Sequence, residues 1–210
     1  MKTPNYRRRL IQLQVQGFTL IELLTVMTII GILAGLVLGT FKFVQEKAAR
    51  SRAEAEIKAM EAGLESYKAD NGAYPDNSTT QGLVPQNSGS PSSGYNTRII
   101  ILYRALTGDT NLDRRVNSTD GNTDIFGATA TGGVAPKSYF ELKPNQLLPA
   151  GGTGTPVTGI VDPWGNFYGY STAGTLGDST KGFNPTFDLW STGGKVGVTA
   201  DDFAKWLKNW

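Results

Sequence analysis

The segment from residue 18 to residue 41 is apolar almost throughout and carries one charged side chain, Glu22. As an α-helix it would extend about 36 Å at 1.5 Å per residue. The hydrocarbon core of a bilayer is roughly 30 Å thick, so this helix can cross a membrane. A carboxylate at mid-membrane costs roughly 2.5 kcal/mol or more. Glu22 lies near the start of the segment, where the cost is lower, but its charge still requires a partner.

Basic residues gather ahead of this segment. Lys2, Arg7, Arg8 and Arg9 precede Gly17, and no acidic residue does. Because positive charge stays on the cytoplasmic side of a membrane, the N-terminal side is expected to be cytoplasmic. Removing these four of the 20 basic residues leaves 16 against 18 acidic ones, a net charge of −2. The rest of the chain therefore gives no reason to expect a nucleic-acid-binding surface.

The order of the basic and apolar parts differs from that of a secretory signal, which is cleaved after its apolar region. Here, cleavage at Gly17 would remove a basic leader, residues 1–17, and keep the apolar helix. The new α-amino group would lie on Phe18, and Glu22 would be the fifth residue. Four residues along a rigid helix separate Glu22 from that amine. A neighbouring subunit, shifted by about one turn, could bring its own amine to Glu22.

The motif GFTLIE at residues 17–22, followed by a long apolar helix, resembles the leader motif of type IV pilins and pseudopilins. The resemblance implies cleavage between Gly17 and Phe18 by a membrane-embedded prepilin peptidase. It also implies N-methylation of Phe18. In this family Glu22 would dock subunits into a helical filament.

Three glycines within the apolar segment, Gly31, Gly35 and Gly39, recur every four residues on one helical face. Small residues at this spacing let transmembrane helices approach closely, so we expect packing between subunits. Each glycine also weakens the helix by about 1 kcal/mol relative to alanine, which predicts some local melting. Many pilus-forming pilins carry a proline near this position. Its absence favours the pseudopilin branch.

An amphipathic helix is predicted over residues 42–72. Apolar residues recur at three- and four-residue steps from Phe41 to Tyr67, with charged residues between them. Asn71-Gly72 and Pro75 predict its end. The stretch YKADNGAYP, residues 67–75, is similar to the helix exit of the major pseudopilins of type II secretion.

The remainder of the chain is predicted to be a loop-rich variable insertion, residues 73–159, and a C-terminal β-sheet region, residues 160–210. Within the insertion, residues 99–106 (IIILYRAL) could form a strand or a short buried helix. The stretches IVDPWGN and FDLWS predict antiparallel hairpins and are similar to the C-terminal sheet of major pseudopilins. The expected fold class is α+β. A long N-terminal helix, with a transmembrane half at 18–41 and an amphipathic half, packs on a small antiparallel sheet.

A first possible calcium site lies at residues 109–120, DTNLDRRVNSTD. Five oxygen-bearing side chains stand at positions 1, 3, 5, 9 and 12 of an EF-hand loop, and the Arg115 carbonyl stands at position 7. The side chains are those of Asp109, Asn111, Asp113, Asn117 and Asp120. The spacing resembles a dockerin calcium loop, but Arg114 occupies position 6, where the sharp turn favours glycine. The alternative interpretation is a polar loop of Asx turns.

A second possible calcium site is implied by the resemblance to major pseudopilins, which carry a calcium loop after F-D-L-x-S-x-G. In this chain that loop runs from residue 193 to residue 202 and offers only Asp201 and Asp202 as acidic ligands, with Lys195 inside it. The two aspartates could equally begin a short helix, DFAKWLKNW, where the helix dipole favours acids.

The composition excludes several chemistries. The chain has no Cys and no His, which removes disulfides, Cys/His zinc sites and nucleophile–histidine pairs. No spacing of carboxylates predicts a catalytic pair, so we expect a protein that is not an enzyme.

We interpret the chain as a structural subunit of a helical, pilus-like filament, the type II secretion pseudopilus that drives protein export. The expected partners are other copies of the chain, minor pseudopilins, prepilin peptidase and an inner-membrane assembly platform. The expected location is the bacterial inner membrane before assembly and a periplasmic or extracellular filament afterwards. Two alternatives stay open: a type IV pilin for adhesion, motility or DNA uptake, and a membrane-anchored, calcium-dependent binding module that shares the leader.

Overall fold

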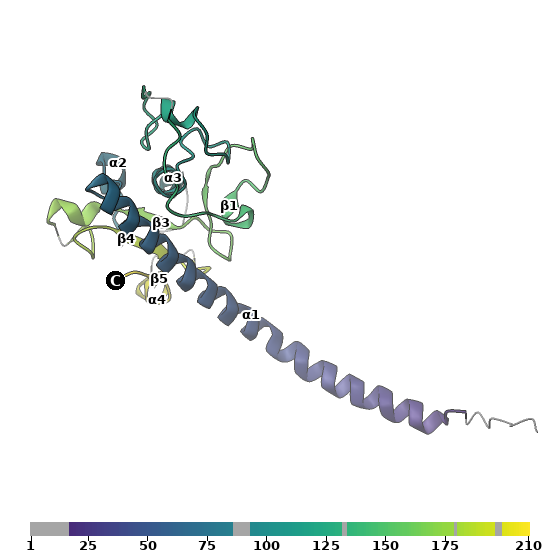
Figure 1. The fold of residues 1–210 in the computed structure, drawn as a ribbon. Helices are drawn as coiled ribbons and strands as arrows, with labels where there is room; N and C mark the ends of the chain where they lie inside the picture. The colour runs from purple at the N-terminus through teal and green to yellow at the C-terminus, as the bar shows by residue number, and fades with distance from the viewer. Residues whose placement is uncertain (1–16, 86–92, 132–133, 179, 196–198) are drawn as a thin grey trace, which may run out of the picture. The chain divides into compact units, whose positions relative to one another are not determined.

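The computed structural model describes residues 17–85, 93–131, 134–178, 180–195 and 199–210 (Figure 1). The chain divides into two compact units, residues 1–45 and 46–210. Most of the predicted leader, residues 1–16, lies outside the described residues.

One long helix, α1 (Leu20–Asn71), runs through both units. Within the described residues, α1 is the one helix that is long and apolar enough to cross a membrane, judged by length and composition. In the first unit its large apolar side chains are exposed all round, from Leu20 (82%) to Val44 (59%). A helix that is apolar on every side requires lipid or other helices around it. The predicted apolar helix is therefore present.

In the second unit, α1 buries one face. Ile57, Met60 and Leu64, which the periodicity placed on the apolar side, are at most 3% exposed. The helix ends at Asn71, as predicted, and Gly72 follows with φ 78°. This left-handed conformation costs glycine little and is a common way to end a helix.

The region predicted to be rich in loops contains a core helix. Residues 99–106 belong to α3 (Ser93–Thr107), so the helical alternative is correct. Ile99, Leu102 and Leu106 recur at helical spacing and are fully buried. A short helix, α2 (Ser78–Gln81), and two 3₁₀ turns, η2 (Asp120–Asn122) and η3 (Pro144–Gln146), also lie between residues 73 and 159.

The strands are short and antiparallel. β1 (Leu147–Leu148) pairs with β2 (Gly159–Ile160). In the second sheet, β4 (Asp188–Ser191) lies between β3 (Gly169–Ser171) and β5 (Leu207–Lys208). The 3₁₀ turn η4 (Ala173–Leu176) follows β3. A long helix packed against small antiparallel sheets confirms the predicted α+β fold.

The core of the second unit joins α1, α3 and the sheets. Its members are buried apolar residues from these elements, among them Ile57, Leu64, Ile99, Leu102, Leu106, Ile160, Tyr168, Tyr170 and Leu189. A second cluster gathers Leu83, Tyr95, Trp190 and Trp206.

The C-terminal end differs from the expected short helix. α4 covers only Ala200–Ala204, and Leu207 and Lys208 form strand β5. Burial of Trp206 and Leu207 favours the strand, and Asn209 fixes it to Leu189. The Leu189 N–H donates to Asn209 Oδ1 at 2.9 Å, and the Asn209 N–H donates to the Leu189 carbonyl at 3.2 Å.

Candidate functional site

Glu22 has a partner within its own chain. Thr19 donates to Glu22 Oε2 from its backbone N–H at 2.8 Å and from its hydroxyl at 2.7 Å. The Glu22 N–H donates back to Thr19 Oγ1 at 3.3 Å. Since α1 begins at Leu20, Thr19 is the N-cap and Glu22 is the third helical residue, the arrangement known as a capping box. The carboxylate is therefore hydrogen-bonded before any subunit joins another.

Sequence reasoning missed Thr19 as the hydrogen-bond partner of Glu22. The pattern Thr-x-x-Glu directly before an apolar run is itself a signature of a helix start. It is present at residues 19–22. An α-amino group was the only partner of Glu22 considered from the sequence. Thr19, which is the nearer donor, was not considered.

The other predicted positions in the first unit are open to the surroundings. Phe18 is 84% exposed. A Cβ atom on Gly17, Gly31, Gly35 or Gly39 would meet nothing within 4 Å, and α1 runs unbroken through the last three. The structure of one chain brings none of these residues together, so cleavage at Gly17, methylation of Phe18 and packing at the glycines stay predictions.

In the second unit, hydrogen bonds from the polar side of α1 tie the helix to the C-terminal half. Glu56 accepts from the Tyr168 hydroxyl at 2.7 Å and pairs with Arg52 at 2.7 Å. Burial, together with the negative charge of Glu56, raises the pKa of the Tyr168 phenol, which stays protonated. The Trp164 indole N–H donates to Glu46 Oε2 at 3.0 Å.

The loop at residues 109–120 folds around its own hydrogen bonds. Asp109 is 1% exposed, and its carboxylate accepts from the backbone N–H groups of Asp113 (3.1 Å) and Arg114 (2.7 Å) and from the Tyr103 hydroxyl (2.6 Å). Asp120 is fully buried and accepts three backbone N–H bonds, from Thr110, Asn111 and Asn117. Burial raises the pKa of Asp109, although the donors around it oppose that shift.

Three side chains in this loop also form Asx turns. Asn111, Asp113 and Asn117 each accept from the backbone N–H two residues further on, at 2.8–2.9 Å. These bonds correspond to the alternative of a polar turn-rich loop.

Arg114 takes the sharp turn that an EF-hand assigns to glycine. Its φ is 68°, in the left-handed region. Its guanidinium donates to the carbonyls of Thr155 (2.9 Å) and Gly151 (2.6 Å) and also contacts that of Pro149. The positive charge of Arg114, which would oppose a nearby cation, is thus bound by the carbonyl groups of a separate loop.

The fit to calcium is incomplete. Within the described residues, no group of three or more acidic side chains is placed to hold a metal ion. The carboxylates at positions 1 and 12 already accept backbone donors. The groups that could face calcium are their remaining lone pairs, the half-buried Asp113 carboxylate and the Arg115 carbonyl.

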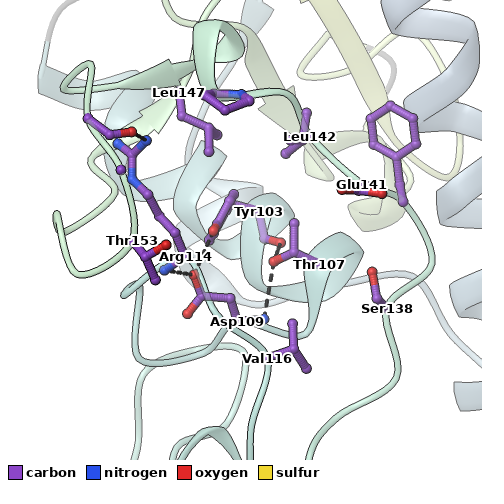
Figure 2. A pocket seen from close by; sticks show the side chains of 14 residues that line it. Tyr103, Thr107, Asp109, Arg114, Val116, Ser138, Glu141, Leu142, Leu147 and Thr153 are labelled. Carbon is purple, nitrogen blue, oxygen red and sulfur yellow. Dashed lines mark hydrogen bonds between the residues drawn. The ribbon is translucent and has the colours of Figure 1, made fainter.

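A pocket of about 460 Å³ lies beside this loop (Figure 2). Figure 2 shows Asp109 and Tyr103 on one side of it and Glu141 on another. Apolar walls come from Val116, Phe140, Leu142 and Leu147. Tyr103 and Asp109, which bond to each other at 2.6 Å, thus both line the pocket.

At the second predicted calcium loop, Thr199 caps a short helix and binds Asp202. Thr199 donates its hydroxyl to Asp202 Oδ2 at 2.6 Å and accepts the Asp202 N–H at 3.2 Å. Asp201 and Asp202 both lie in the first turn of α4, which is the alternative that the sequence offered. Residues 196–198 of this loop lie outside the described residues.

The sequence also matches two protein families. The model of the prokaryotic N-terminal methylation motif matches residues 13–38, and that of type II secretion system protein G matches residues 42–110. The type II secretion system core protein G of Pseudomonas aeruginosa is 31% identical over 191 residues, covering 90% of this chain and 92% of that protein. This chain belongs to the type II secretion system protein G family.

Other members of the protein G family match over shorter stretches. The protein of Pectobacterium carotovorum is 39% identical over 93 residues, covering 40% of this chain and 58% of that protein. That of Escherichia coli K12 is 46% identical over 68 residues, covering 32% and 46%. No solved structure matches the chain significantly.

Membership of the protein G family, the major pseudopilins, confirms the predicted family. These are structural proteins, so the prediction that the chain is not an enzyme is confirmed as well. The methylation-motif match includes Thr19, Glu22, Gly31 and Gly35. The protein G match extends to residue 110 and so includes α3.

Proposed function

We propose that this pseudopilin polymerises into the pseudopilus through the apolar half of α1, after cleavage between Gly17 and Phe18. One observation carries the proposal. The described part of the first unit exposes large apolar side chains on every side of α1, half or more of each surface being open for most of them. Such a helix is stable in lipid or in a bundle of similar helices.

The capping box adds a step to the docking of Glu22. In the single chain, Thr19 satisfies the carboxylate. In the filament, we propose that the α-amino group of a neighbouring Phe18 approaches Glu22 and replaces Thr19 as its partner. The exchange is favourable because an opposite charge in a low-dielectric core contributes more than a neutral donor does.

The proposed role also implies a cellular location and partners. The apolar helix anchors the subunit in the bacterial inner membrane before assembly, with the leader on the cytoplasmic side. Prepilin peptidase, an assembly platform and minor pseudopilins act on it there, and the filament extends into the periplasm. The three glycines at residues 31, 35 and 39 let neighbouring helices pack closely.

Replacement of Glu22 tests the function. Glu22→Ala should abolish or strongly shorten filaments and stop export of a secreted substrate, while the subunit is still processed and present in the membrane. Glu141→Ala removes an exposed carboxylate on the second unit and is the charge-matched control. Normal filaments from Glu22→Ala would contradict the proposal, as would a wild-type chain that retains residues 1–17.

Calcium stays a prediction, and we propose the loop at 109–120 as its site over Asp201 and Asp202. Arg114 supports this choice, because it takes the required turn and its charge is bound elsewhere. Extracellular calcium modules bind with constants of about 0.1–1 mM. Calorimetric titration should show heat in that range that Asp113→Ala removes. If the wild type gives no heat, the loop does not bind calcium and is held by its own hydrogen bonds alone.

A further inference from the structure

The second unit begins at Glu46, where two side chains of α1 bond to distant parts of the chain. Glu46 accepts from the indole N–H of Trp164 at 3.0 Å. One turn later, Arg50 Nη2 donates to the carbonyl of Lys205 at 3.0 Å. Trp164 also packs against the main hydrophobic core. Glu46 and Arg50 are four residues apart and share one face of α1, so the start of α1 in this unit is held by two contacts on that face.

Gly193 and Gly194, which follow β4, pack against the residues that make these two contacts. A Cβ on Gly194 would lie 2.8–3.0 Å from the indole ring of Trp164. A Cβ on Gly193 would lie 3.0 Å from the Lys205 carbonyl and 3.2 Å from Arg50 Nη1. We name Trp164, Gly193, Gly194 and the Lys205 carbonyl the helix collar.

One buried acid braces the helix collar. The Asp162 carboxylate is 4% exposed and accepts the backbone N–H of Trp164 at 3.0 Å and the Ser191 hydroxyl at 2.6 Å. Ser191 Oγ in turn accepts the Gly193 N–H at 3.0 Å. The tryptophan and the glycine segment are thus fixed to the same carboxylate.

We infer that the helix collar positions α1 for assembly by fixing Glu46 as the first residue held by the second unit, with Trp164 and Gly194 as the positioning residues. The inference rests on the proposed filament. The helical residues of α1 before Glu46, residues 20–45, then form a free segment of constant length, about 39 Å at 1.5 Å per residue. Every subunit must present the same length for identical subunits to repeat along a helical filament.

Hydrogen exchange of the full-length, detergent-solubilised chain tests the collar. Trp164→Phe keeps an aromatic side chain but removes the N–H donor, and Gly194→Ala places a methyl group against the indole. Both should speed amide exchange in peptides covering residues 46–52 by roughly tenfold, the effect expected from losing a hydrogen bond to a charged group.

A matched control separates the contact from backbone strain. Gly194 has φ 76° and Gly177 has φ 73°, but a Cβ on Gly177 would meet nothing within 4 Å. Gly177→Ala should therefore leave exchange at residues 46–52 unchanged. Glu46→Gln keeps an acceptor for the Trp164 N–H. Amides at residues 46–52 should therefore exchange more slowly in this variant than in Glu46→Leu. If Trp164→Phe also speeds amide exchange in α3, the substitution has loosened the core. The comparison of Glu46→Gln with Glu46→Leu then decides the test.

Unchanged exchange at residues 46–52 in Trp164→Phe, Gly194→Ala and Glu46→Leu overturns the inference. So do filaments of normal length and number from variants whose exchange is faster. Fewer or shorter filaments from those variants, with normal processing, support it. If the wild type itself forms no filament, the proposed function fails, and the exchange data still decide whether the collar holds the helix.

Discussion

The Ser191 hydroxyl donates to Asp162 Oδ2 at 2.6 Å, joining the last residue of β4 to the turn that precedes β3. Both side chains are buried, at 0% and 4% exposure. Oδ1 of the same carboxylate accepts the N–H groups of Trp164 and Asn166 at 3.0 and 2.9 Å. One acid thus connects the D-P-W-G-N turn to the F-D-L-W-S strand.

Removing the hydroxyl should destabilise the second unit. Ser191→Ala leaves Asp162 Oδ2 and the Gly193 N–H without this partner in a buried setting, which costs about 1–3 kcal/mol of unfolding free energy. Urea denaturation of the solubilised chain measures it. Ser51→Ala, on the exposed surface of α1, is the control and should change little. Equal stability of the two variants would contradict a structural role for the bond.

Asp162 also predicts a dependence on pH. Burial is the main cause that raises the pKa of Asp162, and hydrogen bonds from Ser191 and the backbone oppose the shift. A carboxyl whose pKa is higher in the folded chain stabilises most below its unfolded pKa, about 3.9, and this stability is lost as pH rises through the folded value.

Asp162→Asn removes this titration. The difference in unfolding free energy, variant minus wild type, should therefore increase as pH rises from about 3.9 and become constant once the wild-type carboxyl is ionised. Urea denaturation at a series of pH values measures the difference. A difference that falls over this range would show that the folded chain favours the ionised carboxylate.

The capping box at the start of α1 predicts the effect of Thr19. Thr19→Val removes the hydroxyl that bonds Glu22, and losing an N-cap costs roughly 1 kcal/mol. The first turn of α1 should exchange its amides faster in detergent. Thr19→Ser keeps the hydroxyl and should behave like the wild type. Identical exchange in the valine and serine variants would mean that the hydroxyl does not cap the helix.

Arg114 predicts an order of stabilities. Arg114→Ala and Arg114→Gly both lose the bonds to the carbonyls of Gly151 and Thr155. Glycine accepts φ 68° freely, whereas alanine retains a cost of about 1 kcal/mol in the left-handed region. The glycine variant should therefore be the more stable of the two by about that amount in thermal or urea denaturation. The reverse order would contradict the turn seen here.

Sequence reasoning recovered the features that depend on local pattern. The GFTLIE motif and the apolar run gave the family and the long helix, and three- and four-residue spacing identified Ile57, Met60 and Leu64 as core residues. The helix end at Asn71 followed from Gly72 and Pro75, because their backbone preferences act regardless of the rest of the fold.

What could not be predicted depends on tertiary contacts. The run IIILYRAL suits a strand or a helix, and only packing of Ile99, Leu102 and Leu106 against the core selects the helix. The segment WLKN could continue α4, but burial of Leu207 and pairing with β4 make it a strand. The contacts of Trp164 with Glu46 and of Arg114 with residues 149–155 join positions far apart in sequence, which periodicity does not record.

The central claim is that Glu22 exchanges a local partner, Thr19, for the amine of an adjoining subunit when the filament forms. The most direct measurement is a cryo-electron microscopy structure of the assembled filament that resolves residues 18–22. We expect a mature chain that begins at Phe18 and places its amine within about 4 Å of the Glu22 carboxylate of a neighbour. A filament in which Glu22 contacts only its own Thr19, with every Phe18 amine distant from it, would contradict this exchange.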